Sequence, residues 1–233
     1  MKEFNVKDLL DEEFQIFAGR IGSGKTEIAI NVAIKMKEAG IKNTLFDMDI
    51  VKPYVRIRDL KETLIPKYHL DIVAPPDITR TLDLPIFPKF IIGKLKERGA
   101  QKILDVGGDP YGAGAIAQFR EVMPEGTYNF FFVVNTRRPE TSTKDEILKA
   151  MAVIQNASRM KITGIVFNTN LRWETTEETL KRGFEIVKEV SDYTKLPVVF
   201  GCVDEMHKEI AENLGIPILP LKLFVNPLPK MGV

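Results

Sequence analysis

The sequence predicts an α/β protein with three layers, in which helices cover both faces of a doubly wound, mainly parallel sheet. Short apolar runs alternate along the chain with longer segments of helical period. Uninterrupted apolar strands are typical of parallel sheets buried on both faces. A regular strand–helix alternation also implies right-handed crossovers between neighbouring strands. We therefore expect one domain that spans residues 1–233.

The expected strands are the short apolar runs. In doubly wound sheets ligands bind at the C-terminal ends of the strands, so the residues that directly follow these runs are the first candidates for function. The runs are Phe14–Ala18, Thr44–Phe46, Ile103–Val106, Tyr128–Val134, Ile162–Phe167 and Pro197–Cys202, with a last one near Ile216–Leu219.

Three longer segments have the period and the end signals of helices. Glu27–Ala39 gathers apolar residues on one face and is followed by Gly40, a typical C-terminal cap. Thr143–Ser158 and Thr175–Tyr193 each begin with a threonine that is followed three residues later by a glutamate. This spacing is that of a capping box, which satisfies free N–H groups at a helix start.

Two stretches fit neither pattern. Asp49–Phe87 is rich in proline and Gly107–Gly114 is rich in glycine, and both directly follow expected strands. Both should therefore overhang the ligand-binding edge, and long irregular segments in a compact domain are often functional. Lys52, Arg56 and Arg58 in the first stretch form either a switch segment that touches phosphate, substrate or partner, or a solvated face.

Composition excludes several classes of protein. Lys+Arg 33 against Asp+Glu 32 leaves a net charge of +1, which argues against binding of nucleic acid or anionic membrane by bulk charge. A single cysteine, Cys202, rules out an internal disulfide and a cysteine-ligated metal cluster. The N-terminus has no export signal and no apolar run is long enough for a membrane span, so we expect a cytoplasmic protein.

The segment after the first expected strand has the spacing of a phosphate-binding P-loop, G-x-x-x-x-G-K-[ST]. Its glycines direct amide N–H groups inward as an anion nest, and the next helix points its positive end at the phosphates. We expect Lys25 to reach the β- and γ-phosphates and Thr26 to place its hydroxyl on Mg²⁺. A chance match in a glycine-rich turn is disfavoured by the strand–loop–helix context. The motif comprises Gly19, Arg20, Ile21, Gly22, Ser23, Gly24, Lys25 and Thr26.

Carboxylates follow two further strands, where a magnesium nucleotide would need one to hold metal-bound water. Asp105 ends one strand, and Gly108 completes a D-x-x-G spacing that can present a main-chain N–H to the γ-phosphate. Asp47 and Asp49 end another, and their period-two spacing points both carboxylates to the same side. The alternatives are a strand-end turn for Asp105 and a solvated loop start for the pair.

Together these motifs resemble the SIMIBI class of P-loop NTPases, and within it the MinD/ParA and CobQ/CobB nucleotide-binding proteins. The resemblance runs from Phe14 to about Glu205. The motifs that carry it are the glycine-rich loop, L-F-D-M-D at Leu45–Asp49, D-V-G-G at Asp105–Gly108 and F-N-T-N at Phe167–Asn170.

The resemblance implies a role for each matching residue. Asp49 matches the aspartate that positions or activates the attacking water in MinD-like ATPases, and Asp47 and Asp105 match carboxylates near Mg²⁺. Asn168 matches the asparagine that recognises adenine, although by itself it is also an ordinary strand-end turn residue. Guanine-specific relatives carry N-K-x-D here, whereas this chain has N-T-N-L from Asn168. The resemblance therefore favours ATP over GTP, bound with Mg²⁺.

The loop departs from the MinD-like pattern K-G-G-x-G-K-[ST], whose first lysine reaches the phosphates of the partner in a dimer. Arg20 stands at the place of that lysine, and Ile21 at the place of the next glycine. A guanidinium suits phosphate geometry. Arg20 is therefore either a contact across a homodimer interface or a solvated loop residue.

Three functions fit these expectations. The first is a Mg²⁺-dependent ATPase of the MinD/ParA-like group, which hydrolyses ATP to ADP and so regulates a protein partner or helps to mature an enzyme cofactor. The second is an ATP-dependent small-molecule kinase or ligase of the CobQ/CobB or dethiobiotin-synthetase type, which Ile21 mildly favours. The third is a module that binds nucleotide without turning it over, against which Asp49 speaks. Turnover that depends on an added acceptor separates the second from the first.

Overall fold

One sheet of 8 parallel strands organises the computed structural model, which describes residues 4–49, 56–76 and 87–225. Its strand order is β3-β2-β4-β1-β5-β6-β7-β8, and every pairing is parallel, as the sequence predicts. The strands are β1 Phe14–Ala18, β2 Asn43–Met48, β3 Asp71–Val73, β4 Gln101–Val106, β5 Tyr128–Val134, β6 Gly164–Phe167, β7 Val198–Asp204 and β8 Ile218–Leu221.

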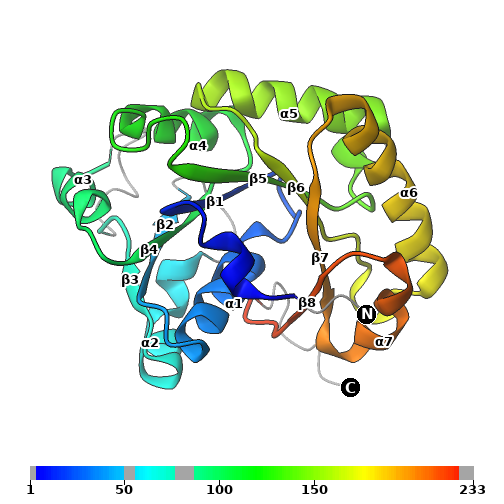
Figure 1. Cartoon of the computed structure of the whole chain (residues 1–233), viewed down its shortest axis with the longest axis horizontal. Helices are drawn as coiled ribbons and strands as arrows, with labels where there is room; N and C mark the ends of the chain where they lie inside the picture. Colours follow the sequence, from blue (N-terminus) through cyan, green and yellow to red (C-terminus); the bar gives the residue numbers. More distant parts are fainter. Residues whose placement is uncertain (1–3, 50–55, 77–86, 226–233) are drawn as a thin grey trace.

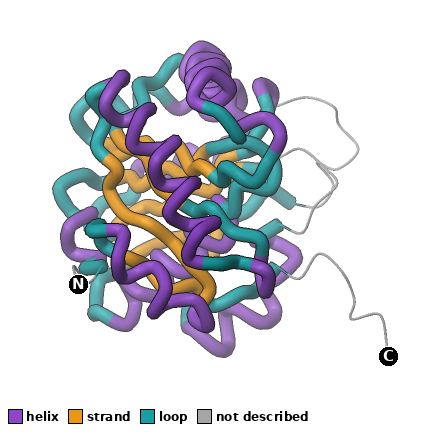
Figure 2. The backbone as a smooth tube through the Cα atoms, turned by 90° about the vertical axis from the view of Figure 1, so that its right-hand side faces the viewer, coloured by secondary structure: helices purple, strands orange, loops and turns teal. Residues whose placement is uncertain are grey.

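Helices cover both faces of this sheet (Figures 1 and 2), which confirms the predicted doubly wound α/β fold. The α-helices are α1 Lys25–Glu38, α2 Lys61–Tyr68, α3 Lys89–Lys96, α4 Pro110–Ala115, α5 Lys144–Ser158, α6 Glu177–Thr194 and α7 Lys208–Ala211. Short 3-10 helices are η1 Val6–Leu9, η2 Ile57–Leu60, η4 Ile116–Phe119, η5 Pro139–Thr141, η6 Arg172–Glu174, η7 Glu205–His207 and η8 Glu212–Leu214.

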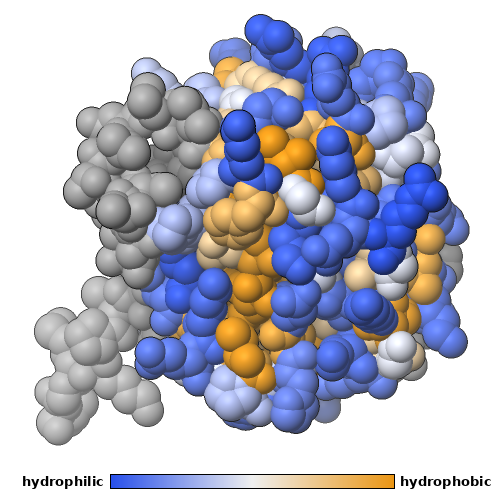
Figure 3. Space-filling model, turned by 90° about the vertical axis from the view of Figure 1, so that its left-hand side faces the viewer, coloured by the Kyte–Doolittle hydropathy of each residue, from blue (hydrophilic) through white to orange (hydrophobic). Residues whose placement is uncertain are grey.

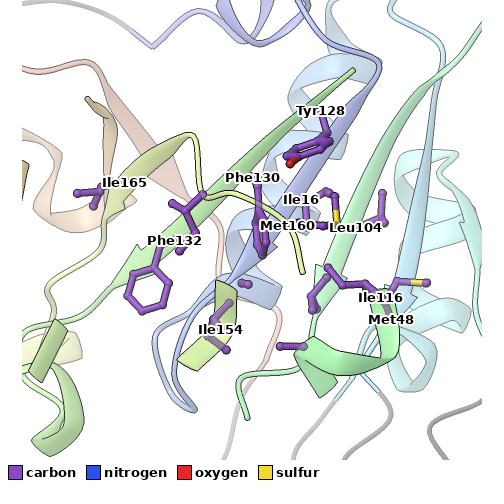
Figure 4. Packing of buried hydrophobic residues seen from close by; sticks show 14 of the residues in the cluster. Ile16, Met48, Leu104, Ile116, Tyr128, Phe130, Phe132, Ile154, Met160 and Ile165 are labelled. Atoms are coloured by element: carbon purple, nitrogen blue, oxygen red, sulfur yellow. The ribbon is translucent and has the colours of Figure 1, made fainter. Parts of the chain in front are cut away.

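The larger hydrophobic cluster fills the space between one face of the sheet and helices α3 to α7. Figure 4 shows part of it, with Ile16, Leu104 and Phe130 contributed by neighbouring strands. Three apolar residues of α5 that recur at helical spacing, Ile147, Met151 and Ile154, are buried here. Burial of apolar side chains on this scale is the main force that holds the layers together.

The second cluster lies on the other face, where α1 packs beside η1, η2 and α2. The apolar face that the sequence predicts for α1, which includes Ile28, Val32 and Met36, is buried, but Ile30 and Ile34 outside that face are buried as well. Contacts with η1 and with the chain after β8 explain the difference, because they cover the helix beyond its sheet-facing side. The helix that follows the P-loop is therefore held from several directions.

The proline-rich stretch contains two elements that the sequence did not predict, α2 and β3. β3 is three residues long and lies at the sheet edge, so the sequence has no long apolar run from which to predict it. α2 is short and contains Pro66, which breaks the usual helical signal. The rest of the predicted overhang at 50–55 and 77–86 lies outside the described residues.

The start of α6 differs by one residue from the predicted one. Thr176, rather than Thr175, is the N-cap, and its side chain accepts a hydrogen bond from the main-chain N–H of Thr179. Thr175 is used elsewhere, since its hydroxyl donates to the carbonyl of Arg172 at 2.6 Å and accepts from Leu171. The capping box expected at Thr143 is present, with Glu146 as its partner.

The molecular surface on the side of the β3 edge is mostly hydrophilic (Figure 3). Hydrophobic side chains gather there in a narrow band across the middle of the face. No helix in the described part of the chain is long and apolar enough to cross a membrane.

Candidate functional site

The P-loop joins β1 to α1 at the C-terminal edge of the sheet. Gly24 is the N-cap of α1 in a left-handed conformation, with φ +91°. A Cβ at this position would overlap the side-chain amide nitrogen of Asn168, so only glycine fits. The loop is closed by a hydrogen bond from the N–H of Ser23 to the carbonyl of Arg20, at 3.0 Å. The loop thus leads directly into the first turn of α1, and the binding of an anion at this helix start stays a prediction.

Lys25 and Thr26 lie where the motif predicts them, in the first turn of α1. The Lys25 side chain is 8% exposed, and its Nζ is 3.8 Å from Oδ2 of Asp49. The hydroxyl of Thr26 donates to Oδ2 of Asp105 at 2.7 Å. Three strands thus bring their carboxyl-terminal residues to one point, because β4 pairs directly with both β1 and β2.

Asp105 is fully buried, and its Oδ1 has no hydrogen-bond partner among the described residues. Burial raises the pKa of this carboxyl to about 7; Lys25 opposes the shift and the nearby charges of Asp49 and Asp47 add to it. A buried polar atom without a partner calls for an explanation. A carboxylate oxygen beside a threonine hydroxyl fits Mg²⁺, a hard cation that prefers oxygen ligands. Thr26 and Asp105 are thus the residues that would hold this metal.

Gly108 lies against the main chain of the P-loop. A Cβ at this position would overlap the carbonyl oxygen of Gly19 and would lie 2.9 Å from the nitrogen of Ile21. The D-x-x-G segment can therefore approach the loop only with glycine at this position. This contact places the Gly108 main chain beside the expected phosphate position, where its predicted N–H contact with the γ-phosphate stays a prediction.

Asp47 is as buried as Asp105, but its contacts differ from those expected of a metal neighbour. Oδ2 accepts from Nε and from the main-chain N–H of Arg58, at 2.7 and 3.0 Å. Oδ1 accepts from the other end of the guanidinium at 3.1 Å and from the N–H of Asp49 at 3.2 Å. Burial disfavours the charged form of Arg58. The hydrogen bonds and the negative charge of Asp47 nevertheless raise the pKa of Arg58 above its usual value. These contacts tie Asp47 to Arg58 and to the main chain of Asp49, and its expected place near Mg²⁺ stays a prediction.

Asn168 follows β6 and lies under the P-loop. Its amide nitrogen donates to the carbonyl of Ser23 at 2.7 Å, and its Oδ1 has no partner among the described residues. The side chain is 2% exposed. Asn168 is therefore placed beside the P-loop, and its expected contact with the base stays a prediction.

Arg20 is engaged within its own chain. Its Nε donates to Oε2 of Glu140 at 2.9 Å, a second guanidinium nitrogen pairs with the other oxygen, and a third contact reaches the carbonyl of Gly108 at 3.5 Å. Arg138 donates from Nε to the carbonyl of Gly22 at 3.1 Å. The loop after β5 thus holds the P-loop from outside. The sequence carries no signal for either contact, since Arg138 and Glu140 lie in no motif.

Glu27 and Asn31 connect α1 to the chain after β8, a contact that the sequence did not predict. The carboxylate of Glu27 accepts the main-chain N–H groups of Phe224 and Val225, at 2.9 and 2.6 Å. Asn31, one helical turn further, bonds both the N–H and the carbonyl of Lys222 at 2.9 Å. Burial raises the pKa of Glu27, and these N–H groups partly offset it. Two polar residues inside an apolar helix pattern were the available signal.

The geometry defines an α/β fold in which the P-loop joins β1 to α1, with a buried carboxylate beside the loop threonine and a second carboxylate near the loop lysine. No protein-family model and no curated protein matches this sequence. Solved structures with the same architecture include signal recognition particle receptors FtsY, to which the chain is 14–16% identical.

The FtsY from Elizabethkingia anophelis, in complex with GDP, is 15% identical with a TM-score of 0.58, over 91% of this chain and 60% of that one. The FtsY from Thermotoga maritima is 14% identical with a TM-score of 0.57, over 88% and 67%. The FtsY from Mycoplasma mycoides is 16% identical with a TM-score of 0.54, over 82% and 60%.

Likeness at this level of identity shows the fold. It confirms the parallel, doubly wound architecture that the sequence predicts, and it selects neither the MinD/ParA nor the CobQ/CobB branch. The chain spans about three fifths of the length of the first of these FtsY chains.

Proposed function

We propose that this protein is a Mg²⁺-dependent nucleoside triphosphatase that binds ATP and acts as a nucleotide switch. The observation that carries the proposal is the meeting of three groups at one sheet edge. They are the Lys25 ammonium near Asp49, the Thr26–Asp105 hydrogen bond, and the Asp105 oxygen that has no hydrogen-bond partner in the described part of the chain. Phosphoryl transfer needs this combination of a cation, a metal position and a water-orienting carboxylate.

Each group has a distinct task in the proposed reaction. Main-chain N–H groups of the loop and Lys25 neutralise the phosphate oxygens, and Mg²⁺ on Thr26 and Asp105 would add charge neutralisation when bound. Asp49 orients the attacking water in line with the γ-phosphorus. The rate gain comes from positioning and electrostatics, since no covalent step on the protein is required.

ATP is the proposed nucleotide because the N-T-N-L run from Asn168 has no aspartate to accept the N1 and N2 protons of guanine. GTP is the alternative, favoured by the FtsY structure that was determined in complex with GDP. Competition between ATP and GTP for the wild-type protein, measured by calorimetry with Mg²⁺, decides between them. Asn168→Ala should bring the affinities for ATP and GTP closer together. An unchanged ratio of the two affinities would show that Asn168 does not recognise the base.

Phosphate release from ATP tests the proposed activity. Lys25→Ala should weaken ATP binding by roughly 100-fold, because the principal cation at the phosphates is lost. Asp49→Ala should retain ATP binding and lower turnover by about 100-fold or more, as expected for loss of a positioned base. Asp71→Ala, which removes an exposed carboxylate at the sheet edge, is the matched control. Unchanged turnover in Asp49→Ala would refute the catalytic assignment.

A small-molecule kinase or ligase remains the second candidate, favoured by Ile21 in place of a loop glycine. Phosphate release without any added acceptor supports the switch, and turnover that requires an acceptor supports the second candidate. The switch also requires a protein partner, or a second copy of the chain, that distinguishes the ATP from the ADP state. Arg20 is held by Glu140 in its own chain, so a homodimer contact through Arg20 would have to break that pair.

A further inference from the structure

The ion pair between Asp47 and Arg58 is buried and doubly hydrogen-bonded, and it lies next to the proposed site. The two side chains are 0% and 5% exposed, and the guanidinium contacts both carboxylate oxygens. Removing two charges from water is costly, and an apolar pair of similar volume is often as stable. Stability alone therefore does not account for a buried arginine at this place.

The pair also holds the main chain of Asp49 from both sides. The N–H of Asp49 donates to Oδ1 of Asp47 at 3.2 Å. The carbonyl of Asp49 accepts from the guanidinium of Arg58 at 2.8 Å. Both peptide groups that flank the Asp49 Cα are thus tied to one rigid, buried unit. The direction of the Asp49 side chain toward Lys25 depends on this backbone.

We propose that Arg58 is a positioning residue, which together with Asp47 fixes the Asp49 main chain so that the Asp49 carboxylate stays directed at the phosphate site. The inference rests on the proposed nucleotide hydrolysis. It replaces the expected metal-shell role of Asp47 with an anchoring one. A misplacement of about 1 Å at a reacting group can lower a rate by roughly 100-fold, so a fixed backbone at Asp49 matters for turnover more than for binding.

Lysine is the informative replacement for Arg58. An ammonium keeps the charge beside Asp47, but it lacks the planar fork that bonds two carboxylate oxygens and a carbonyl together. Arg58→Lys should therefore lower kcat for nucleotide hydrolysis by at least 10-fold and change KM less than 3-fold. Arg58→Gln, which is neutral and close in length, is a second variant. Arg56→Lys is the control, because Arg56 is also buried but faces Asp59, with Nε 3.5 Å from Oδ2.

A double-mutant cycle with Asp49 separates positioning from a general structural effect. If Arg58 acts through Asp49, Arg58→Lys in an Asp49→Asn background should change the residual rate by less than about 2-fold. A sensitive assay with γ-labelled nucleotide follows that slow rate, and thermal unfolding monitors the fold of each variant.

The two hypotheses fail in different ways. Suppose that the wild-type protein hydrolyses nucleotide. If Arg58→Lys then leaves kcat unchanged, or lowers the rate equally with Asp49 and with Asp49→Asn, the inference is wrong and the proposed function still stands. A wild-type protein that hydrolyses no nucleotide would overturn the proposed function and the inference with it.

Discussion

The ends of β2 and β4 each carry a buried aspartate, but the two carboxylates differ in their hydrogen bonds. Asp47 and Asp105 are Cα partners in neighbouring parallel strands, and both are 0% exposed. Asp47 accepts from Arg58 and from two main-chain N–H groups, whereas Asp105 accepts from Thr26 and keeps one oxygen without a partner among the described residues. Burial alone therefore does not decide what a strand-end carboxylate does; its partners do.

The two sites also differ in what they hold. The fully bonded carboxylate is an anchor for the main chain at Asp49. The partly bonded one has an oxygen without a hydrogen-bond partner among the described residues, and burial raises its pKa against the opposing charge of Lys25. Equivalent substitutions at the two positions should therefore have opposite effects on stability.

Asp47→Asn should give the largest effect, a loss of about 3–5 kcal/mol in the free energy of unfolding. The amide cannot neutralise the Arg58 guanidinium, which would be left as an uncompensated buried charge. For a chain of this size the loss corresponds to a fall in Tm of roughly 10 °C. Chemical denaturation followed by circular dichroism measures it.

Asp71→Asn is the control for this loss. Asp71 is an exposed carboxylate on edge strand β3 that also accepts a hydrogen bond, from Thr44 at 2.7 Å. Its substitution should change stability by less than about 0.5 kcal/mol. Equal effects of Asp47→Asn and Asp71→Asn would show that the Arg58 pair is not the anchor we describe.

Asp105→Asn should stabilise the protein without ligand, and the gain should depend on pH. The pKa of Asp105 is about 7 in the folded state against a usual 3.8, so folding is linked to proton uptake between these values. The wild type loses stability as pH rises through this window, while the neutral amide does not. At pH 8 the variant should be more stable by about 2–4 kcal/mol, and the difference should vanish near pH 4.

Unfolding free energies of Asp105→Asn and wild type at pH 8, 7, 6 and 5 test the sign of this linkage. The same variant should lose Mg²⁺-dependent nucleotide binding, because the amide is a poorer magnesium ligand than the carboxylate. A variant that is less stable than wild type at pH 8 would contradict the description of Asp105 as an unsatisfied buried carboxylate.

The sequence was sufficient for every strand except the edge strand β3 and for the location of the loop. Uninterrupted apolar runs predict buried parallel strands, and β1 and β5 begin and end at the predicted residues. The P-loop spacing predicts the positions of Lys25 and Thr26 because a nest of N–H groups requires glycines at fixed intervals. Short edge elements such as β3 carry too few residues for a periodic signal.

The sequence could not show how the carboxylates are partnered. Asp47 and Asp105 have the same strand-end signature, and the arginine that distinguishes them lies eleven positions after Asp47 in a stretch without clear period. The contact between Glu27 and the main chain of Phe224 joins residues 197 positions apart. Such pairs depend on the tertiary fold, so propensity and spacing do not encode them.

Thr26→Val makes the smallest change at the β4 end, the loss of one hydroxyl in an otherwise similar shape. Asp105 would then lose its hydrogen bond from Oγ1, which lowers its pKa in the wild type. The variant should lose about 1–2 kcal/mol of unfolding free energy at pH 8. The loss should be smaller at pH 5, where Asp105 is protonated and the charged form no longer needs that donor.

Thr44→Val is the matched control for this change, because the Thr44 hydroxyl donates to Asp71 over the same 2.7 Å but in an exposed position. Water replaces a lost partner there, and valine suits a strand, so stability should change by less than about 0.5 kcal/mol at either pH. If Thr26→Val and Thr44→Val cost the same, or if the cost at position 26 does not depend on pH, the hydroxyl is not stabilising a buried carboxylate. A loss of unfolding free energy that depends on pH and occurs only in Thr26→Val would show that Thr26 stabilises the buried charge of Asp105. That charge lies at the end of β4, beside the loop that is expected to bind phosphate.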